Sequence, residues 1–84
     1  MALKKIVLDV LIPLEVSVVD LVENLNSIEG VEAVEIDIRA IERKVETTVI
    51  TVEGNGFSYD SVKETLEKTG ATMQNIDRIA AGRK

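Results

Sequence analysis

Hydrophobic residues recur along the chain with two periods, and the two periods alternate. A period of two is clearest over 31–39, where Val34, Ile36 and Ile38 alternate with charged residues. This spacing is typical of a strand with one buried face and one wet face. We predict four strands, at 3–12, 31–39, 45–53 and 71–79.

The segments between these strands carry helical spacing and helix-terminal residues. Ser17 is a predicted N-cap, and the apolar positions that follow fit one face of a helix over 18–29. A second helix begins after either Ser58 or Asp60 and ends at Gly70, where a left-handed residue is expected. The last residues, 80–84, are predicted to form a frayed tail.

The element order β-α-β-β-α-β predicts a single domain over 1–84. With right-handed crossovers this order gives an α+β, ferredoxin-like sandwich. Its sheet has four antiparallel strands, in the spatial order 4-1-3-2 when numbered along the chain, and both helices cover one face. The alternative is a pair of β-α-β units that exchange strands in a dimer.

The sheet face that the helices leave open is predicted to have an apolar centre. In the first strand Ile6, Leu8, Val10 and Ile12 form the set expected to face the helices, which leaves Val7, Asp9 and Leu11 outside. On the third strand the open set is either Val45, Val49 and Thr51 or Ile50 and Val52. Such a patch often marks an interaction surface, although scattered exposed aliphatics are also ordinary. We therefore expect a homo-oligomer, with the candidate interface residues Val7, Asp9, Leu11, Val49 and Thr51.

Composition excludes several kinds of chemistry. The 84 residues include no His, Cys or Trp, one Phe and one Tyr, and the net charge is −5. Imidazole catalysis, thiol nucleophiles, disulfides and Fe–S clusters are therefore ruled out. An acidic chain with two aromatic residues lacks the basic footprint and stacking platforms of nucleic-acid binders, so no nucleic-acid partner is expected.

The N-terminal segment only faintly imitates a secretion signal. Asp9 interrupts its apolar run, and no small-residue cleavage site follows. No stretch approaches the roughly 18 apolar residues of a membrane span. We expect a cytoplasmic protein with no membrane partner.

Carboxylates are the remaining candidates for chemistry. Asp9 interrupts an apolar strand, and Asp77 lies on the strand predicted to be its neighbour. Two such carboxylates suit Ca²⁺ or Mg²⁺, which take oxygen ligands. The simpler interpretation of Asp9 is a solvent-facing charge that discourages wrong strand register.

Four short motifs also resemble a known family. They lie at 7–13, 50–54, 66–70 and 76–82, and together they resemble a family of small archaeal proteins (domain of unknown function 211). The resemblance implies a ferredoxin-like fold, a tendency to form ring-like or other homo-oligomers, and no established activity. It also implies bound divalent cations in some relatives. Asp9, Glu53 and Asp77 match the family pattern and are the candidate metal ligands.

The sequence therefore favours a structural or regulatory module that assembles with itself through a sheet face or edge. The alternative is a divalent-cation-binding protein or cation-dependent enzyme that uses carboxylates on the first and last strands. No catalytic residue is assigned, and enzymatic activity is not favoured.

Overall fold

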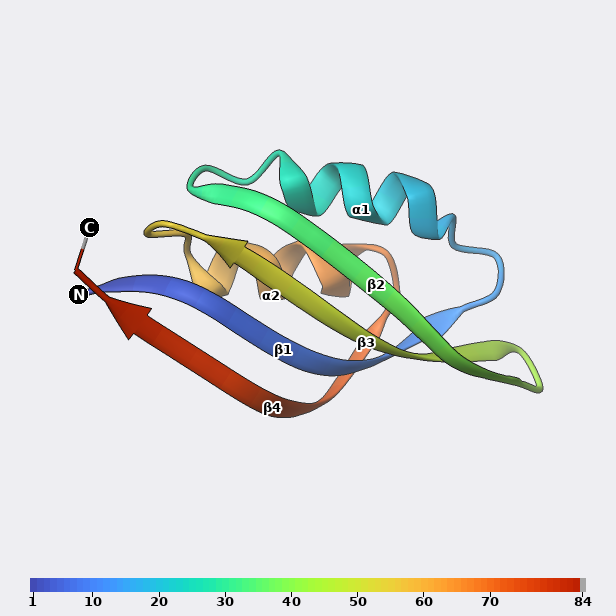
Figure 1. Cartoon of the computed structure of the whole chain (residues 1–84). Helices are drawn as coiled ribbons and strands as arrows, with labels where there is room; N and C mark the ends of the chain where they lie inside the picture. The colour runs from blue at the N-terminus through green and yellow to red at the C-terminus, as the bar shows by residue number, and fades with distance from the viewer. Residues whose placement is uncertain (84) are drawn as a thin grey trace.

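The computed structural model describes residues 1–83 and has six elements, shown in Figure 1. They are β1 (Ala2–Pro13), α1 (Val18–Asn26), β2 (Val31–Glu42), β3 (Val45–Gly54), α2 (Tyr59–Lys68) and β4 (Thr72–Gly82).

The sheet confirms the predicted ferredoxin-like fold. Its strands lie in the order β2-β3-β1-β4, every neighbouring pair is antiparallel, and both helices lie on one face (Figure 1). This is the predicted 4-1-3-2 order seen from the other edge. One chain supplies all four strands, so the strand-exchanged alternative is not adopted. The two edges of the sheet are β2 and β4.

Serine residues begin both helices. The Ser17 hydroxyl accepts a hydrogen bond from the Asp20 amide, and the Ser58 hydroxyl accepts one from the Ser61 amide, each at 3.2 Å. These bonds satisfy amides that have no partner within the helix. Ser58, and not Asp60, is therefore the N-cap of α2.

Helix α1 ends at Asn26, three residues before the predicted end. The Ser27 hydroxyl donates to the Asn24 carbonyl at 2.7 Å, and the Ser27 amide donates to the carbonyls of the last turn. Gly30, with a φ of 89°, then turns the chain into β2. Side-chain competition for the last carbonyls thus stops the helix before the apolar pattern does.

The core lies between the helices and one face of the sheet. Its buried members are mostly aliphatic: Ile6, Leu8, Val10, Ile12, Leu21, Leu25, Ile50, Val52, Phe57, Val62, Leu66 and Ala71. Thr48 is fully buried beside them, and its hydroxyl donates to the Val10 carbonyl at 2.8 Å. The facing of β3 follows from this: Ile50 and Val52 point to the helices, and Val49 and Thr51 belong to the open face.

Two strands extend beyond their predicted ends because partner strands are available. At the end of β4, Gly82 pairs with Ala2 and Ala81 pairs with Leu3, so the prediction of a tail over 80–82 was wrong. The part of that predicted tail at residue 84 lies outside the described residues. β2 likewise continues to Glu42, which pairs with Val45 across a tight turn.

Neither helix could span a bilayer. α1 has nine residues and α2 has ten, and no helix within residues 1–83 combines the length and the apolar character that a membrane crossing needs.

The close approach of two loops makes Gly54 sensitive to substitution. A methyl group at Gly54 would collide with the Gly30 carbonyl oxygen and lie 2.9 Å from the Val31 Cα, and both are backbone atoms. We expect Gly54→Ala to lower the free energy of unfolding by about 1–3 kcal/mol, because the backbone must shift. Urea unfolding monitored by circular dichroism measures this change.

Gly82→Ala is the matched control for this prediction. A methyl group at Gly82 meets only the flexible Lys4 side chain, at 3.6 Å, so stability should change little. Equal effects of the two substitutions would contradict the proposed collision.

Candidate functional site

Two of the predicted carboxylates come together on the open face of the sheet. The Asn75 amide nitrogen lies 2.9 Å from Asp77 Oδ1 and 3.5 Å from Asp9 Oδ2, so one amide donates toward both side chains. Asp9 comes from β1, and the other two residues come from the neighbouring edge strand β4. We call these three residues the carboxylate cluster.

A bulge in β4 brings the cluster together. Val7 pairs with Arg78 and Leu8 pairs with Ile76, so the register skips Asp77. An extra residue on one strand bends that strand locally and re-aims its side chains. The bulge lets Asp77 approach Asp9, although Asn75 is the register partner of Asp9.

The contact between the two carboxyl groups changes the acidity of Asp77. A hydrogen bond with Asp9 is the main cause that raises the pKa of Asp77 above its ordinary value, and partial loss of hydration and repulsion from the Asp9 charge add to it. The Asn75 amide acts in the opposite direction because it stabilises the ionised form. Asp77 therefore holds its proton more tightly than an isolated aspartate does.

Glu53, the third candidate metal ligand, lies elsewhere on the sheet. It pairs with Lys5 in the β1–β3 register, whereas Asp9 pairs with Val49 four positions away. Its carboxylate lies 3.9 Å from the Lys5 ammonium. Within residues 1–83, no three carboxylates converge in a way that could hold a metal ion.

A shallow trough of about 370 Å³ lies beside the cluster on the same face. Val7, Val49 and Thr51 line it from the two central strands. The charged residues of its lining are Glu35, Asp37, Arg39, Asp77 and Arg78. Arg39 binds Asp37 at 3.0 Å, so part of this charge is already paired.

The five candidate interface residues all belong to this open face. They are all half-buried: Val7, Asp9 and Leu11 on β1, and Val49 and Thr51 on β3. The apolar centre of the face is thus present as predicted, but none of its members projects freely.

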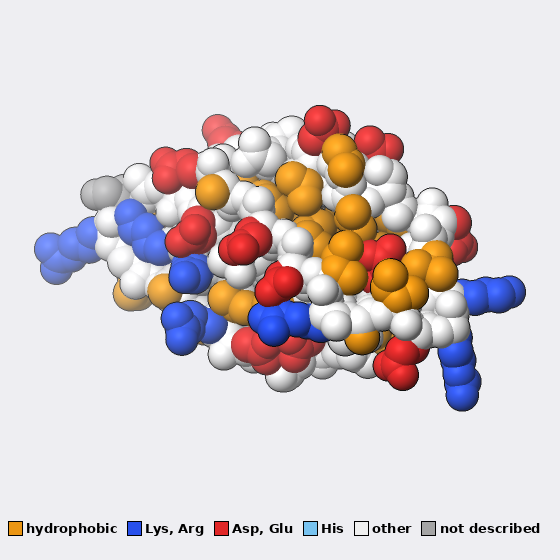
Figure 2. All heavy atoms as spheres, turned by 45° about the vertical axis from the view of Figure 1, so that its right-hand side comes forward, with side chains coloured by type: hydrophobic (Ala, Val, Ile, Leu, Met, Phe, Trp, Pro, Cys, Tyr) orange, Lys and Arg blue, Asp and Glu red, His pale blue; other side chains and the backbone are white. Residues whose placement is uncertain are grey.

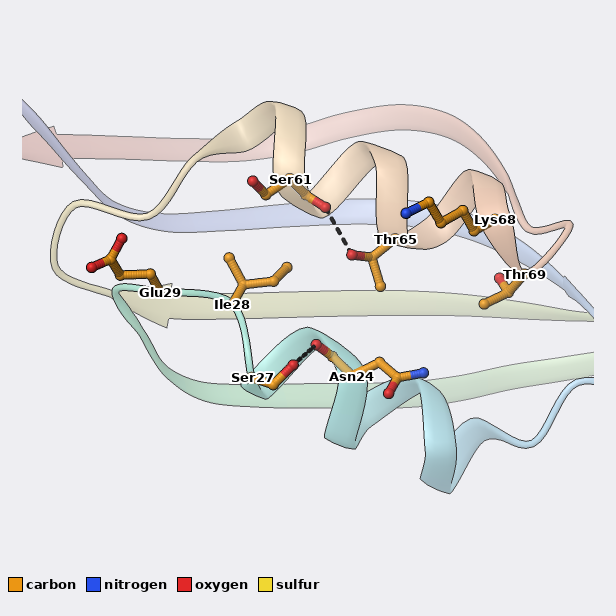
Figure 3. A pocket seen from close by; sticks show the side chains of 8 residues that line it. All are labelled: Asn24, Ser27, Ile28, Glu29, Ser61, Thr65, Lys68 and Thr69. Carbon is orange, nitrogen blue, oxygen red and sulfur yellow. Dashed lines mark hydrogen bonds between the residues drawn. The ribbon is translucent and has the colours of Figure 1, made fainter.

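The sequence did not indicate the second hollow, a groove of about 420 Å³ between the two helices (Figure 3). Three hydroxyls in its lining donate to carbonyls of their own chain segment: Ser27 to Asn24, Thr65 to Ser61 and Thr69 to Leu66, at 2.7–2.8 Å. These bonds finish or stabilise helical turns, so the hydroxyls have a structural use. Glu29 and Lys68 are the charged residues of the lining.

Comparison with known proteins assigns the chain to a family. Residues 4–84 match the model of domain of unknown function 211, described as Uncharacterized ArCR. An uncharacterized protein of Methanocaldococcus jannaschii is 34% identical over 82 residues, which cover 98% of this chain and 84% of the relative. The chain therefore belongs to this archaeal family of unknown function.

The contact between Asp9 and Asp77 predicts a pH effect. Because the folded chain binds the Asp77 proton more tightly than the unfolded chain, stability should fall as pH rises from the ordinary pKa of aspartate through the raised pKa of Asp77. Asp9→Asn removes the like charge and leaves an amide donor. We expect it to lower the pKa of Asp77 and to abolish this fall, as measured by carboxyl NMR titration and urea unfolding across that interval.

Glu35→Gln serves as the control, since Glu35 lies on the same face and has no hydrogen bond to the pair within the described residues. An Asp77 pKa that responds equally to both substitutions would contradict the prediction.

Proposed function

We propose that this protein is a structural or regulatory module of the cytoplasm that works as a homo-oligomer assembled through its sheet. The observation that carries the proposal is the one-sided covering of the sheet. Both helices lie on one face, so the other face and both edges remain without a layer of protein over them (Figure 1).

The small size of the domain supports self-association. A domain of about 60 residues buries only about 60% of its unfolded surface, and chains of this size gain stability from a partner. In this chain the open face carries Val7, Leu11 and Val49, which are only half-buried. A second copy would remove this apolar surface from water.

The composition argues in the same direction. Without imidazole or thiol groups, the open face offers carboxylates, amides, hydroxyls and two arginines, and within residues 1–83 no hydroxyl on it is hydrogen-bonded to a base. Self-association of the chain requires no catalytic pair of nucleophile and base.

The first test is the mass of the protein in solution. We expect sedimentation velocity and light scattering at micromolar concentration to give a multiple of the 9.2 kDa chain mass. The physical reason is that copies of the chain cover each other's apolar surface. A mass of one chain, unchanged up to 100 μM, would rule the proposal out.

The second candidate function is divalent-cation binding. The observation that favours it is the contact between the carboxyl groups of Asp9 and Asp77. Two carboxylates in contact repel each other when both are ionised, and a hard cation between them would relieve that repulsion. Asn75 adds an amide oxygen as a third donor after rotation of its side chain. A cation-dependent enzyme would also require this cation site, so a test of cation binding tests both functions.

Calorimetric titration with Ca²⁺, Mg²⁺ and Mn²⁺ tests the second candidate. Saturable binding is expected for the wild type, and Asp9→Asn should weaken it at least tenfold because one charged ligand is lost. Glu53→Gln is the matched control, since Glu53 pairs with Lys5 away from the cluster, and its binding should equal that of the wild type. No saturable heat with any of the three ions excludes this function.

A further inference from the structure

We propose that the groove between the two helices binds a short peptide with free termini, about three residues long. We call it the interhelix groove. The end of α1 and the turn after it line one side of the groove, and α2 lines the other (Figure 3). Peptide binding here requires no contact between copies of the chain.

The interhelix groove is a polar part of the surface. Hydrophobic side chains gather on one part of the molecule, with acidic side chains around them (Figure 2). The groove has a different character, because Ile28 alone is apolar among its lining residues within 1–83, and that side chain is half-buried. The other lining residues carry hydroxyl, amide, carboxylate or ammonium groups. A ligand of this groove is therefore recognised mainly by hydrogen bonds and charge.

Three hydroxyls of the lining can only accept hydrogen bonds from a ligand. Ser27, Thr65 and Thr69 already donate their hydroxyl protons to carbonyls of their own chain segments, at 2.7–2.8 Å. A hydroxyl has a single proton but also has lone pairs, so each oxygen remains an acceptor. A ligand that fills this part of the groove must supply donors, and the N–H groups of a peptide backbone are such donors.

The two ends of the groove carry opposite charges. Glu29 lies at one end, beside the C-terminal end of α1, and Lys68 lies at the other, in the last turn of α2 (Figure 3). The last turn of α1 has no basic residue, so the negative end of its helix dipole adds to the Glu29 charge. Within residues 1–83, neither Glu29 nor Lys68 forms an ion pair. A ligand with an ammonium group at one end and a carboxylate at the other complements both.

The length of the groove selects the size of the ligand. Ser61, near the Glu29 end, and Lys68 are seven residues apart on α2, which separates them by about 10 Å along the helix axis. An extended peptide of three residues also spans about 10 Å, so its termini reach both ends. A single amino acid carries both charges on one carbon atom and reaches only one end. The groove volume of about 420 Å³ lies in the range of small-ligand sites.

The interhelix groove lies on the helix side of the molecule. The open face and its carboxylate cluster lie on the other side of the sheet (Figure 1). Copies assembled through the open face would leave the groove accessible. Peptide binding and self-association can therefore be measured separately.

An NMR titration with trialanine tests the peptide site. Trialanine offers free termini, peptide N–H donors and small side chains. For the wild type we expect saturable shifts at concentrations up to about 10 mM, largest for the backbone amides of Ser27, Thr65 and Thr69. Acetylation of the peptide amine and amidation of its carboxylate should each weaken binding about threefold to fivefold, the loss expected for one exposed ion pair.

Substitutions assign each end of the peptide to its partner. Glu29→Gln should weaken trialanine binding to the same extent, and acetylation of the peptide should then have no further effect. Lys68→Met should do the same for amidation of the peptide carboxylate. Thr65→Val replaces the acceptor hydroxyl with a methyl group and should weaken all three peptides alike. Circular dichroism checks that each variant is folded.

Glu64→Gln and Lys63→Met are the matched controls. Both residues are exposed on α2 and lie outside the groove lining. Each control removes the same charge as its counterpart in the groove, so the two variants should bind trialanine as the wild type does.

Three results would overturn the peptide site. The first is the absence of a saturable shift with trialanine. The second is equal weakening by the control substitutions, which would indicate a general effect of charge. The third is equal binding of trialanine and its acetylated and amidated forms to the wild type, which would show that the charged ends of the groove recognise neither terminus.

Discussion

The difference in length between helices and strands is the constraint on which the rest of this structure depends. A nine-residue helix is about 14 Å long, whereas a twelve-residue strand is about 40 Å long. Two such helices can cover only the middle of one face. The core is therefore compact and central, and the apolar alternation of the strands continues past the point where the helices can bury it. Ile38 and Ile41 on the edge strand β2 remain exposed. Ile76 and Ile79 are exposed for a different reason: they pair with the buried Leu8 and Ile6, but they lie on the edge strand β4, which has a neighbouring strand on one side only.

The same constraint separates two kinds of outer surface. The open face is wide and mixed in character, and a bulge there brings Asp9 and Asp77 into contact. The edges are narrow and carry the freely exposed aliphatics. Carboxylate chemistry and apolar contact thus occupy different parts of the molecule, so substitutions can address them separately.

The strands, helices and fold could be predicted from the sequence because local patterns decide them. Alternation over β2 and the Ser17 cap gave correct elements, whereas the cap of α2 was left open between Ser58 and Asp60. The facing of β3 could not be predicted, since Val49 and Ile50 are equally apolar. In the structure Ile50 faces the helices, on the same side as Thr48, whose buried hydroxyl donates to the Val10 carbonyl. The end of α1 differed because Ser27 competes for carbonyls of the last turn.

The candidate site was only partly predictable, for a geometric reason. Asp9 and Asp77 were expected on neighbouring strands, but their contact depends on a register shift in β4 that no periodic pattern reveals. The match of Glu53 to the family pattern did not show where Glu53 lies relative to Asp9. The separation of the two residues depends on the register of β1 and β3, which the sequence does not reveal. Ile38 belonged to the predicted buried face of its strand, and its exposure at the edge of the sheet depends on tertiary packing that no local pattern reveals.

The pairing of Ala2 with Gly82 makes the chain suitable for circular permutation. The two ends of the described chain lie side by side at one end of the sheet, and the β2–β3 turn at Arg43 and Lys44 lies at the other (Figure 1). A linker of a few residues suffices to join the ends, and the exposed turn offers a place to open new ones. A circular permutant of this kind would keep every strand neighbour while moving the chain termini, and any tag attached to them, to the far end of the molecule.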